Sequence, residues 1–173
     1  MQKLKVYLDT SVFGYLYLTK SSEIMQITRD FVELLKKDDH YILCTSIITI
    51  REIDCAPEPL KSYLKCDLSK LGTMLLKESK EINQLQAEYL ENKLLTPKSI
   101  DDLMHISFAV YYQCDIIASW NFKHFVNENT IYHLKRINQR LGLPIVDIVS
   151  PRTFMERLTD GNGMDDIIKR NPS

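Results

Sequence analysis

Three acidic residues lie beside short apolar segments at widely separated places in this sequence. Asp9 ends the apolar run at residues 5–8, whereas Glu52 and Asp102 are embedded in apolar patterns with helical spacing. Carboxylates that converge from separate elements hold Mg²⁺ or Mn²⁺, ions that activate water and neutralise charge on a phosphate. Without a cation, three such carboxylates repel one another. The combination therefore indicates a divalent-metal site suited to phosphodiester hydrolysis.

A fourth segment, Ser119-Trp120-Asn121, follows another short apolar run. The amide oxygen of Asn121 can coordinate a hard cation or orient its water, although it adds no charge. Hydroxyl groups and an amine next to these segments are candidates for substrate binding, with helix capping and a solvated turn as the alternatives. They are Thr10, Ser11, Ser119 and Lys123.

Each acid also has a simpler interpretation when it is considered alone. Asp9 could end a strand as a turn or cap residue, and Glu52 could lie on a solvated helix face. Asp101 and Asp102 both fall in the first turn of a helix expected from about residue 100 to 113, where acids stabilise the positive helix end. We expect one of this pair to be a helix N-terminal acid only.

Short apolar runs alternate with amphipathic segments along the chain, and this order predicts a three-layer α/β/α sandwich with a central parallel sheet. Right-handed crossovers would bring every strand-end acid to one edge. The strands are expected near residues 5–9, 41–45, 115–119 and 144–149, with Met74–Leu76 left open. Helices are expected near residues 12–18, 22–37, 47–56, 58–71, 78–95, 100–113, 127–141 and 151–158.

The whole chain has 173 residues and a formal net charge of −1, with 22 basic and 23 acidic residues. These values predict a single domain over residues 1–158 and a flexible C-terminal tail over residues 159–173. The near-neutral charge means that binding to RNA must depend on local patches. One modest candidate is the helix face with Lys135, Arg136 and Arg140.

Four cysteines lack a C-x-x-C pairing and lie in apolar surroundings, so we expect reduced, buried thiols and a cytoplasmic protein. No apolar stretch approaches the ~20 residues that a membrane helix needs, so no membrane association is expected. The five glycines do not form a nucleotide-binding loop.

Taken in order, these segments resemble the PIN-domain family, metal-dependent ribonucleases that include the VapC-type toxins of toxin–antitoxin pairs. The family's strand-end acid and following small hydroxyl residue match residues 9–11, and its S/T-x-x-x-x-x-E helix matches residues 46–52. Its D-x-x-H-I segment matches residues 102–106, which favours Asp102 over Asp101 as the ligand. Its T-W-D or S-W-N segment matches residues 119–121.

The resemblance implies a ribonuclease whose metal ligands are Asp9, Glu52 and Asp102, with Asn121 completing the catalytic set. It also implies a homodimer and a small antitoxin that covers an apolar groove near the site. Residues 12–18 suit either such a groove or the core. Because Asn121 stands where many members carry a fourth acid, the chain resembles a Ser-Trp-Asn branch. The alternative is a weak or inactive PIN-like scaffold that binds RNA or a protein partner.

A strand-end aspartate is also found in phosphatases of the haloacid-dehalogenase type, which need a second acid two residues later. That position is Ser11, which opposes this alternative. His105 lies on an apolar helix face and is expected to be packed and hydrogen-bonded, and Trp120 to be packed at the strand end. His40 and His133 show no ligand spacing with His105, so zinc is not expected.

Overall fold

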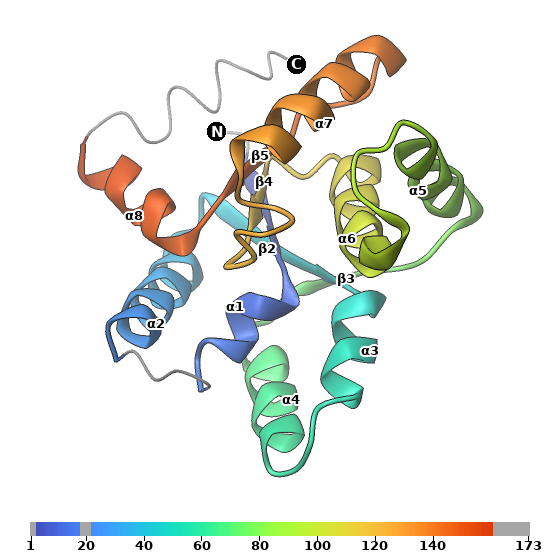
Figure 1. Cartoon of the computed structure of the whole chain (residues 1–173). Coiled ribbons are helices and arrows are strands. Elements are labelled where there is room, and N and C mark those ends of the chain that lie inside the picture. The colour runs from blue at the N-terminus through green and yellow to red at the C-terminus, as the bar shows by residue number, and fades with distance from the viewer. Residues whose placement is uncertain (1–2, 18–21, 161–173) are drawn as a thin grey trace.

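The computed structural model describes residues 3–17 and 22–160. Its centre is a five-stranded, fully parallel sheet in the order β3-β2-β1-β4-β5 (Figure 1). The strands are β1 (Leu4–Leu8), β2 (Tyr41–Ser46), β3 (Met74–Leu76), β4 (Ile116–Ala118) and β5 (Asp147–Val149). The parallel pairing confirms the predicted parallel sheet, and β1 is its central strand.

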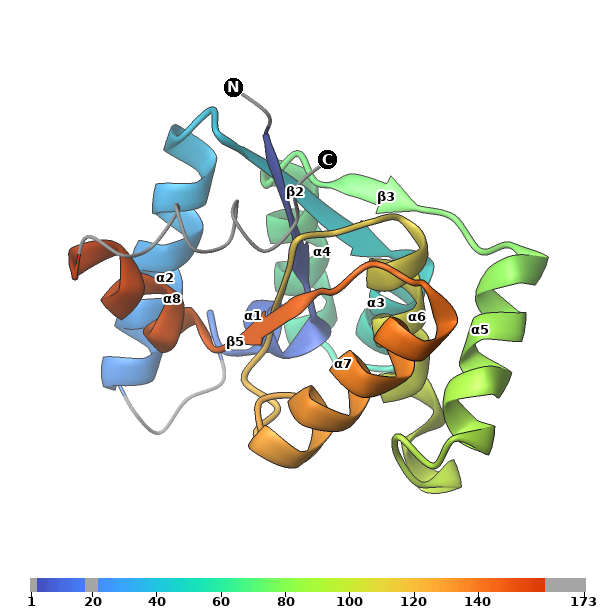
Figure 2. The same cartoon turned by 90° about the horizontal axis from the view of Figure 1, so that it is seen from above.

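Helices cover both faces of the sheet, so the predicted three-layer α/β/α sandwich is confirmed. Figures 1 and 2 show α5 and α6 on the opposite side of the sheet from α2 and α8. The helices are α1 (Thr10–Gly14), α2 (Ser22–Lys37), α3 (Ile47–Asp54), α4 (Leu60–Lys70), α5 (Lys80–Glu91), α6 (Ile100–Tyr111), α7 (Glu128–Leu141) and α8 (Pro151–Thr159), with a 3₁₀ turn η1 (Pro97–Ser99).

Alternation along β1 divides the core into two clusters, because successive strand side chains point to opposite faces. Tyr7 packs with α5, α6 and α7, whereas Val6 and Leu8 pack with α1, α2 and α8. All three side chains are fully buried. The residue after Leu8 therefore emerges at the carboxyl edge on the same face as Tyr7.

Register brings the strand ends together at that edge. Leu8 pairs with Ala118, and the backbone N–H of Asp9 donates to the carbonyl of Ala118 at 3.1 Å. Ser119 continues from β4, and its N–H donates to the carbonyl of Val149 at 3.0 Å. Asp9 and Ser119 thus leave adjacent strands side by side, where open α/β folds place their ligands.

Several element boundaries differ from the sequence prediction. Met74–Leu76, which was left open, is edge strand β3. The helix expected over 12–18 is α1 at Thr10–Gly14, and Leu18 lies outside the described residues. The helix expected over 78–95 begins after Ser79, whose hydroxyl caps it by accepting from the Ile82 N–H at 3.4 Å.

The domain prediction can be followed only to the end of the described residues. Helix α8 runs to Thr159, and residues 161–173 of the expected tail lie outside the described part of the chain. No helix in the described ranges combines the length and apolar character required to cross a membrane.

The expectation of four buried cysteines is wrong for two of them. Cys44 and Cys114 are buried free thiols, whereas Cys55 and Cys66 are exposed. Cys55 follows the last turn of α3. Cys66 lies on α4, in which Leu64 is the one buried residue. Apolar neighbours in the sequence were therefore not sufficient to predict burial of these two side chains.

Candidate metal centre

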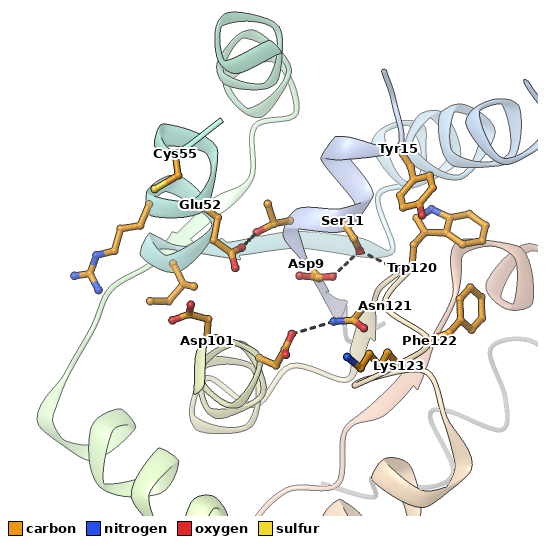
Figure 3. A pocket seen from close by; sticks show the side chains of 14 residues that line it. Asp9, Ser11, Tyr15, Glu52, Cys55, Asp101, Trp120, Asn121, Phe122 and Lys123 are labelled. Atoms are coloured by element: carbon orange, nitrogen blue, oxygen red, sulfur yellow. Dashed lines mark hydrogen bonds between the residues drawn. The ribbon is translucent and has the colours of Figure 1, made fainter. Parts of the chain in front are cut away.

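The carboxyl edge of the sheet opens into a cavity of about 840 Å³. Figure 3 shows Asp9 and Glu52 on one side of the opening and Asn121 with Lys123 across from them. The predicted site residues that line the cavity are Asp9, Thr10, Ser11, Glu52, Asp102, Asn121 and Lys123. The structure therefore brings together side chains from β1, α1, α3, α6 and the segment after β4.

Asp9 is 5% exposed and is held by two hydroxyl groups. Its Oδ2 accepts hydrogen bonds from Ser11 Oγ at 2.5 Å and Ser119 Oγ at 2.7 Å. Each hydroxyl in turn accepts a backbone N–H, from Trp120 at 2.9 Å and from Asn121 at 2.9 Å. Both hydroxyls are therefore used within the protein, and this geometry favours orientation of Asp9 over direct contact with a substrate.

Glu52 projects from α3 toward the same opening, with its side chain 35% exposed. Its Oε2 accepts a hydrogen bond from Thr10 Oγ1 and lies 3.0 Å from His105 Nε2. Thr10 is thus another hydroxyl that orients an acid. The sequence candidates with hydroxyl groups all support carboxylates in this structure.

Behind the acids lies a buried hydrogen-bond chain. The Tyr7 hydroxyl lies 2.6 Å from His105 Nδ1 and 2.7 Å from Ser46 Oγ. His105 Nε2 faces Glu52 and lies 3.7 Å from Asp9 Oδ1. Tyr7 is fully buried and His105 is 1% exposed, so neither has water as an alternative partner.

His105 was expected to be packed and hydrogen-bonded, and both features are confirmed. Its approach to two acids was missed, although ligand atoms of Asp9, Glu52 and His105 lie within 4.8 Å of one another. A signal was available, because the D-x-x-H spacing puts Asp102 and His105 on one helix face. Tyr7 lies two residues before Asp9 and so shares its strand face.

Electrostatic surroundings separate the two half-buried acids. Burial, followed by the charges of Asp9 and Glu52, raises the pKa of Asp102 despite opposing contributions from His124 and His105. Burial also acts to raise the pKa of Glu52, but the hydrogen bond and charge of His105, with the Thr10 bond, outweigh it and lower that pKa. Asp102 is therefore the acid whose charge is least supported by the protein itself.

His105 is affected in the opposite sense. Its burial acts to lower its pKa, but the hydrogen bond to Glu52 and the charges of Asp9, Glu52 and Asp102 together raise it. The donor set is rich in carboxylate oxygens with one imidazole nearby, which suits a hard divalent cation such as Mg²⁺ or Mn²⁺. These residues fit the ion that the sequence predicted.

Asn121 supports Asp102 directly. Its Nδ2 donates to Asp102 Oδ1 at 2.9 Å, and its Oδ1 accepts the His124 N–H at 3.0 Å. The amide oxygen thus holds the following turn, which differs from the expected role of offering that oxygen to the cation. Asp101 is exposed, whereas Asp102 is half-buried and bonded, so the geometry favours Asp102 as the ligand.

The remaining sequence candidates divide between core and cavity wall. Trp120 is 6% exposed and donates from Nε1 to Thr28 Oγ1 at 3.0 Å, so it is packed as predicted. In the apolar run, Val12 and Phe13 are fully buried, which favours the core interpretation. Tyr15 is half-buried and lines the cavity.

Neither a protein-family model nor a curated protein matches this sequence. Solved structures do match. VapBC2 from Rickettsia felis, crystallised with a DNA fragment from its promoter, aligns with a TM-score of 0.56 and 17% identity over 85% of this chain and 98% of that chain. The fold is PIN-like. DNA-bound VapBC from Salmonella typhimurium aligns with a TM-score of 0.51 and 16% identity over 86% of this chain and 98% of that chain.

Proposed function

We propose that this protein is a divalent-metal-dependent ribonuclease and the toxin of a toxin–antitoxin pair. One observation carries the proposal: Asp9, Glu52 and Asp102 come from three separate elements and line one open cavity at the carboxyl edge of a PIN-like fold. The charge of Asp102 is disfavoured by burial and by the other acids. A cation would relieve that repulsion.

The chain's own residues would hold and orient the reacting groups. Asp9, Glu52 and Asp102 would hold Mg²⁺ or Mn²⁺, and each is itself fixed by a partner: Ser11 and Ser119, Thr10 and His105, and Asn121 respectively. When bound, the ion supplies an activated water and neutralises charge on the phosphate. Lys123 is exposed at the cavity wall and would contact the RNA backbone.

The toxin assignment is supported by the two VapBC structures, which are both DNA-bound complexes. By analogy of fold, this chain would pair with a small antitoxin, form a homodimer and act in the cytoplasm. Co-expression with the product of an adjacent small gene, followed by size-exclusion chromatography with light scattering, tests both associations.

Cleavage of a mixed RNA pool by the purified chain tests the enzyme. We expect cutting with Mg²⁺ or Mn²⁺, no cutting with EDTA, and loss of cutting in Asp9→Asn. Asp101→Asn, a change of the same kind at the exposed neighbour of Asp102, should keep activity. Cutting that persists in EDTA or in Asp9→Asn contradicts the proposal.

The second candidate is a PIN-like scaffold that binds RNA or a protein without cutting. The neutral amide of Asn121, bonded to Asp102 where a fourth acid would add charge, is the observation in its favour. Wild-type protein that binds Mn²⁺ but leaves RNA intact, while Asn121→Asp is also inactive, would favour the scaffold.

A further inference from the structure

Two further cavities continue from the candidate metal centre along α7. Lys123 lines the site cavity and also a neighbouring cavity of about 630 Å³, which Lys93, His124 and Asn129 line as well. A third cavity of about 290 Å³ begins one helical turn farther on, with His133 on α7 and Asn92 beside Lys93. The three hollows therefore form one path across the molecular surface.

Beyond the site cavity, the lining of this path is basic. No acid lines the second or third cavity among the described residues. We call the following side chains the basic track: Lys123, His124, Lys93, His133, Arg136 and Arg140. The chain as a whole has a net charge of −1, so this is a local concentration of positive charge.

The cavity between α2 and α4 differs from this part of the path, because its lining contains both basic and acidic side chains. The cavity between α2 and α4 pairs Lys36 and Lys70 with the acids Glu33 and Asp67 in its lining. Lys123, Lys93, Arg136 and Arg140 form no salt bridge with any described carboxylate, whereas Arg51, Arg152 and Arg157 each form one. Because these cations have no carboxylate partner in the described part of the chain, their charge is available to phosphates.

Hydrogen bonds fix the beginning of the track. Asn121 accepts the His124 N–H, and Asn127 donates to the carbonyl of Lys123 at 3.1 Å while capping α7 by accepting from Thr130 N–H at 2.9 Å. The turn that carries Lys123 is thus held at both ends. Its position relative to the metal ligands is set by the protein before any ligand binds.

The far end of the track is also preorganised. Arg140 donates to Asn92 Oδ1, which joins the end of α5 to α7. The Arg136 guanidinium lies 5.6 Å from the centre of the Tyr132 ring. Lys93 occupies a left-handed backbone position with φ 56°, which glycine adopts at lower cost. The lysine side chain therefore adds backbone strain at the end of α5.

Exposed aromatic rings accompany these cations. Phe122, beside Lys123 at the mouth of the site cavity (Figure 3), is 55% exposed, and Tyr132 is 57% exposed. They are the two most exposed large apolar side chains of the described residues. Cations that follow a backbone, together with rings on which bases stack, are the features that bind single strands without sequence preference.

We propose that the basic track binds the phosphodiester backbone of a single-stranded polynucleotide that extends from the metal centre, an inference that rests on the proposed ribonuclease function. The track guides one flank of the RNA substrate across α7, with Phe122 and Tyr132 stacking on its bases. Substrate affinity then depends on length beyond the cleavage site.

Fluorescence anisotropy with a fluorescein-labelled 16-nucleotide oligouridylate tests the track in EDTA, where cleavage is prevented. The double variant Arg136→Gln/Arg140→Gln should bind about tenfold more weakly and show a log–log salt slope shallower by about 1.4, from roughly 0.7 per phosphate contact. The matched control Lys36→Gln/Lys70→Gln removes the same charge from the mixed cavity and should change affinity less than about twofold. An equal loss of affinity in the two double variants would contradict the proposed role of the basic track.

Two single variants separate binding from folding. Lys93→Gly should weaken binding yet raise the melting temperature, because glycine relieves the left-handed backbone. Tyr132→Ala should weaken binding roughly fivefold or more through lost stacking, whereas Tyr63→Ala, an equally exposed tyrosine on α4, should not. Unchanged binding in both Lys93→Gly and Tyr132→Ala overturns the proposal.

The same binding measurement with other nucleic acids identifies the type of polynucleotide that the basic track binds. Losses of similar size on oligothymidylate support recognition of the shared phosphate backbone, and losses on RNA alone support added contacts to the 2′-hydroxyl. Tighter binding of a 16-base-pair duplex overturns single-strand recognition. If the wild type binds as expected but cuts no RNA, the ribonuclease proposal is contradicted and the proposal for the basic track stands. If the protein cuts RNA but the variants bind it as tightly as the wild type, only the proposal for the basic track is contradicted.

Discussion

Asn121 Nδ2 donates a hydrogen bond to Asp102 Oδ1 at 2.9 Å, so a neutral amide faces an acid whose pKa is raised by burial. A carboxylate at position 121 would meet Asp102 as a like charge. The amide therefore stabilises the cation-free protein relative to a carboxylate at this position, but it contributes no charge to hold the cation. This balance leads to the first prediction.

Asn121→Asp is expected to lower the free energy of unfolding of the metal-free protein by about 1–2 kcal/mol, because a donor is replaced by a like charge. The same variant should bind Mn²⁺ more tightly and cut RNA faster, since the ligand set gains a charge. Urea denaturation in EDTA and calorimetric titration with Mn²⁺ measure the two effects.

The double exchange Asp102→Asn/Asn121→Asp is the matched control for that prediction. It restores one donor and one acceptor between the two positions, so metal-free stability should return to within about 0.5 kcal/mol of wild type. If the single and double variants are equally unstable, repulsion between positions 102 and 121 is not the cause.

Asp102→Asn alone should stabilise the metal-free protein at pH 7 by about 0.5–1 kcal/mol, as is common where function requires crowded charge. Burial raises the folded-state pKa of Asp102 above its unfolded value, so the folded state binds the proton more tightly. Wild-type stability is accordingly lost as pH rises through the folded-state pKa. The gain from Asp102→Asn should appear at neutral pH and vanish below the ordinary aspartate range, near pH 4.

Asp101→Asn is the companion variant, because it removes the same charge from the exposed adjacent residue. Its stability should stay within about 0.5 kcal/mol of wild type at both pH values. Denaturation curves at pH 4 and pH 7 check the pair. A stability gain that is equal at the two pH values would contradict the assigned cause.

Divalent cations should raise the melting temperature of the wild type. At a concentration of 100 times Kd the gain is about 2.7 kcal/mol, because the ion binds the folded chain. Asp9→Asn and Glu52→Gln should each lose most of this response while keeping the fold. Thermal scans with Mg²⁺, Mn²⁺ or EDTA give the measurement, and an undiminished response in both variants would exclude these acids as ligands.

Tyr7→Phe should weaken cation binding from within the core. The change removes the hydroxyl that His105 and Ser46 share but keeps the shape of the side chain. A buried polar group left without a hydrogen-bond partner costs about 1–3 kcal/mol of stability. His105 then loses the bond that fixes its ring against Glu52. Calorimetry should show lower Mn²⁺ affinity.

Tyr89→Phe provides the comparison for that effect. Its hydroxyl donates to Asn138 Oδ1 at 2.8 Å, in the core between α5 and α7 and away from the acids. We expect a similar loss of stability with Mn²⁺ affinity unchanged. Equal losses of affinity in both variants would mean that general destabilisation explains the Tyr7 result.

Sequence patterns were sufficient for the parts of the site that follow from topology. A parallel sheet brings strand-end residues to one edge, so Asp9 and the segment from Ser119 to Asn121 could be placed together before any coordinates. Helical periodicity likewise placed Glu52 and Asp102 on helices that begin near that edge. These inferences need only chain direction and repeat, which the sequence carries.

The supporting contacts required coordinates. Contact of Tyr7 with His105 and Ser46 depends on the register between β1 and β2 and on the depth at which α6 packs, neither of which is encoded by local spacing. The orientation of the Asn121 amide depends on the turn that follows it. Exposure of Cys55 and Cys66 depends on how α3 and α4 lie against the core.

The side chain of Asn121 joins two regions that the chain otherwise supplies from separate elements. One end of its amide bonds Asp102, and the other holds the turn that carries Lys123. A shift of Asp102 on cation binding is therefore expected to move the turn that carries the first cation of the basic track. For sites coupled in this way, the polynucleotide changes the affinity for the cation by the same factor as the cation changes the affinity for the polynucleotide.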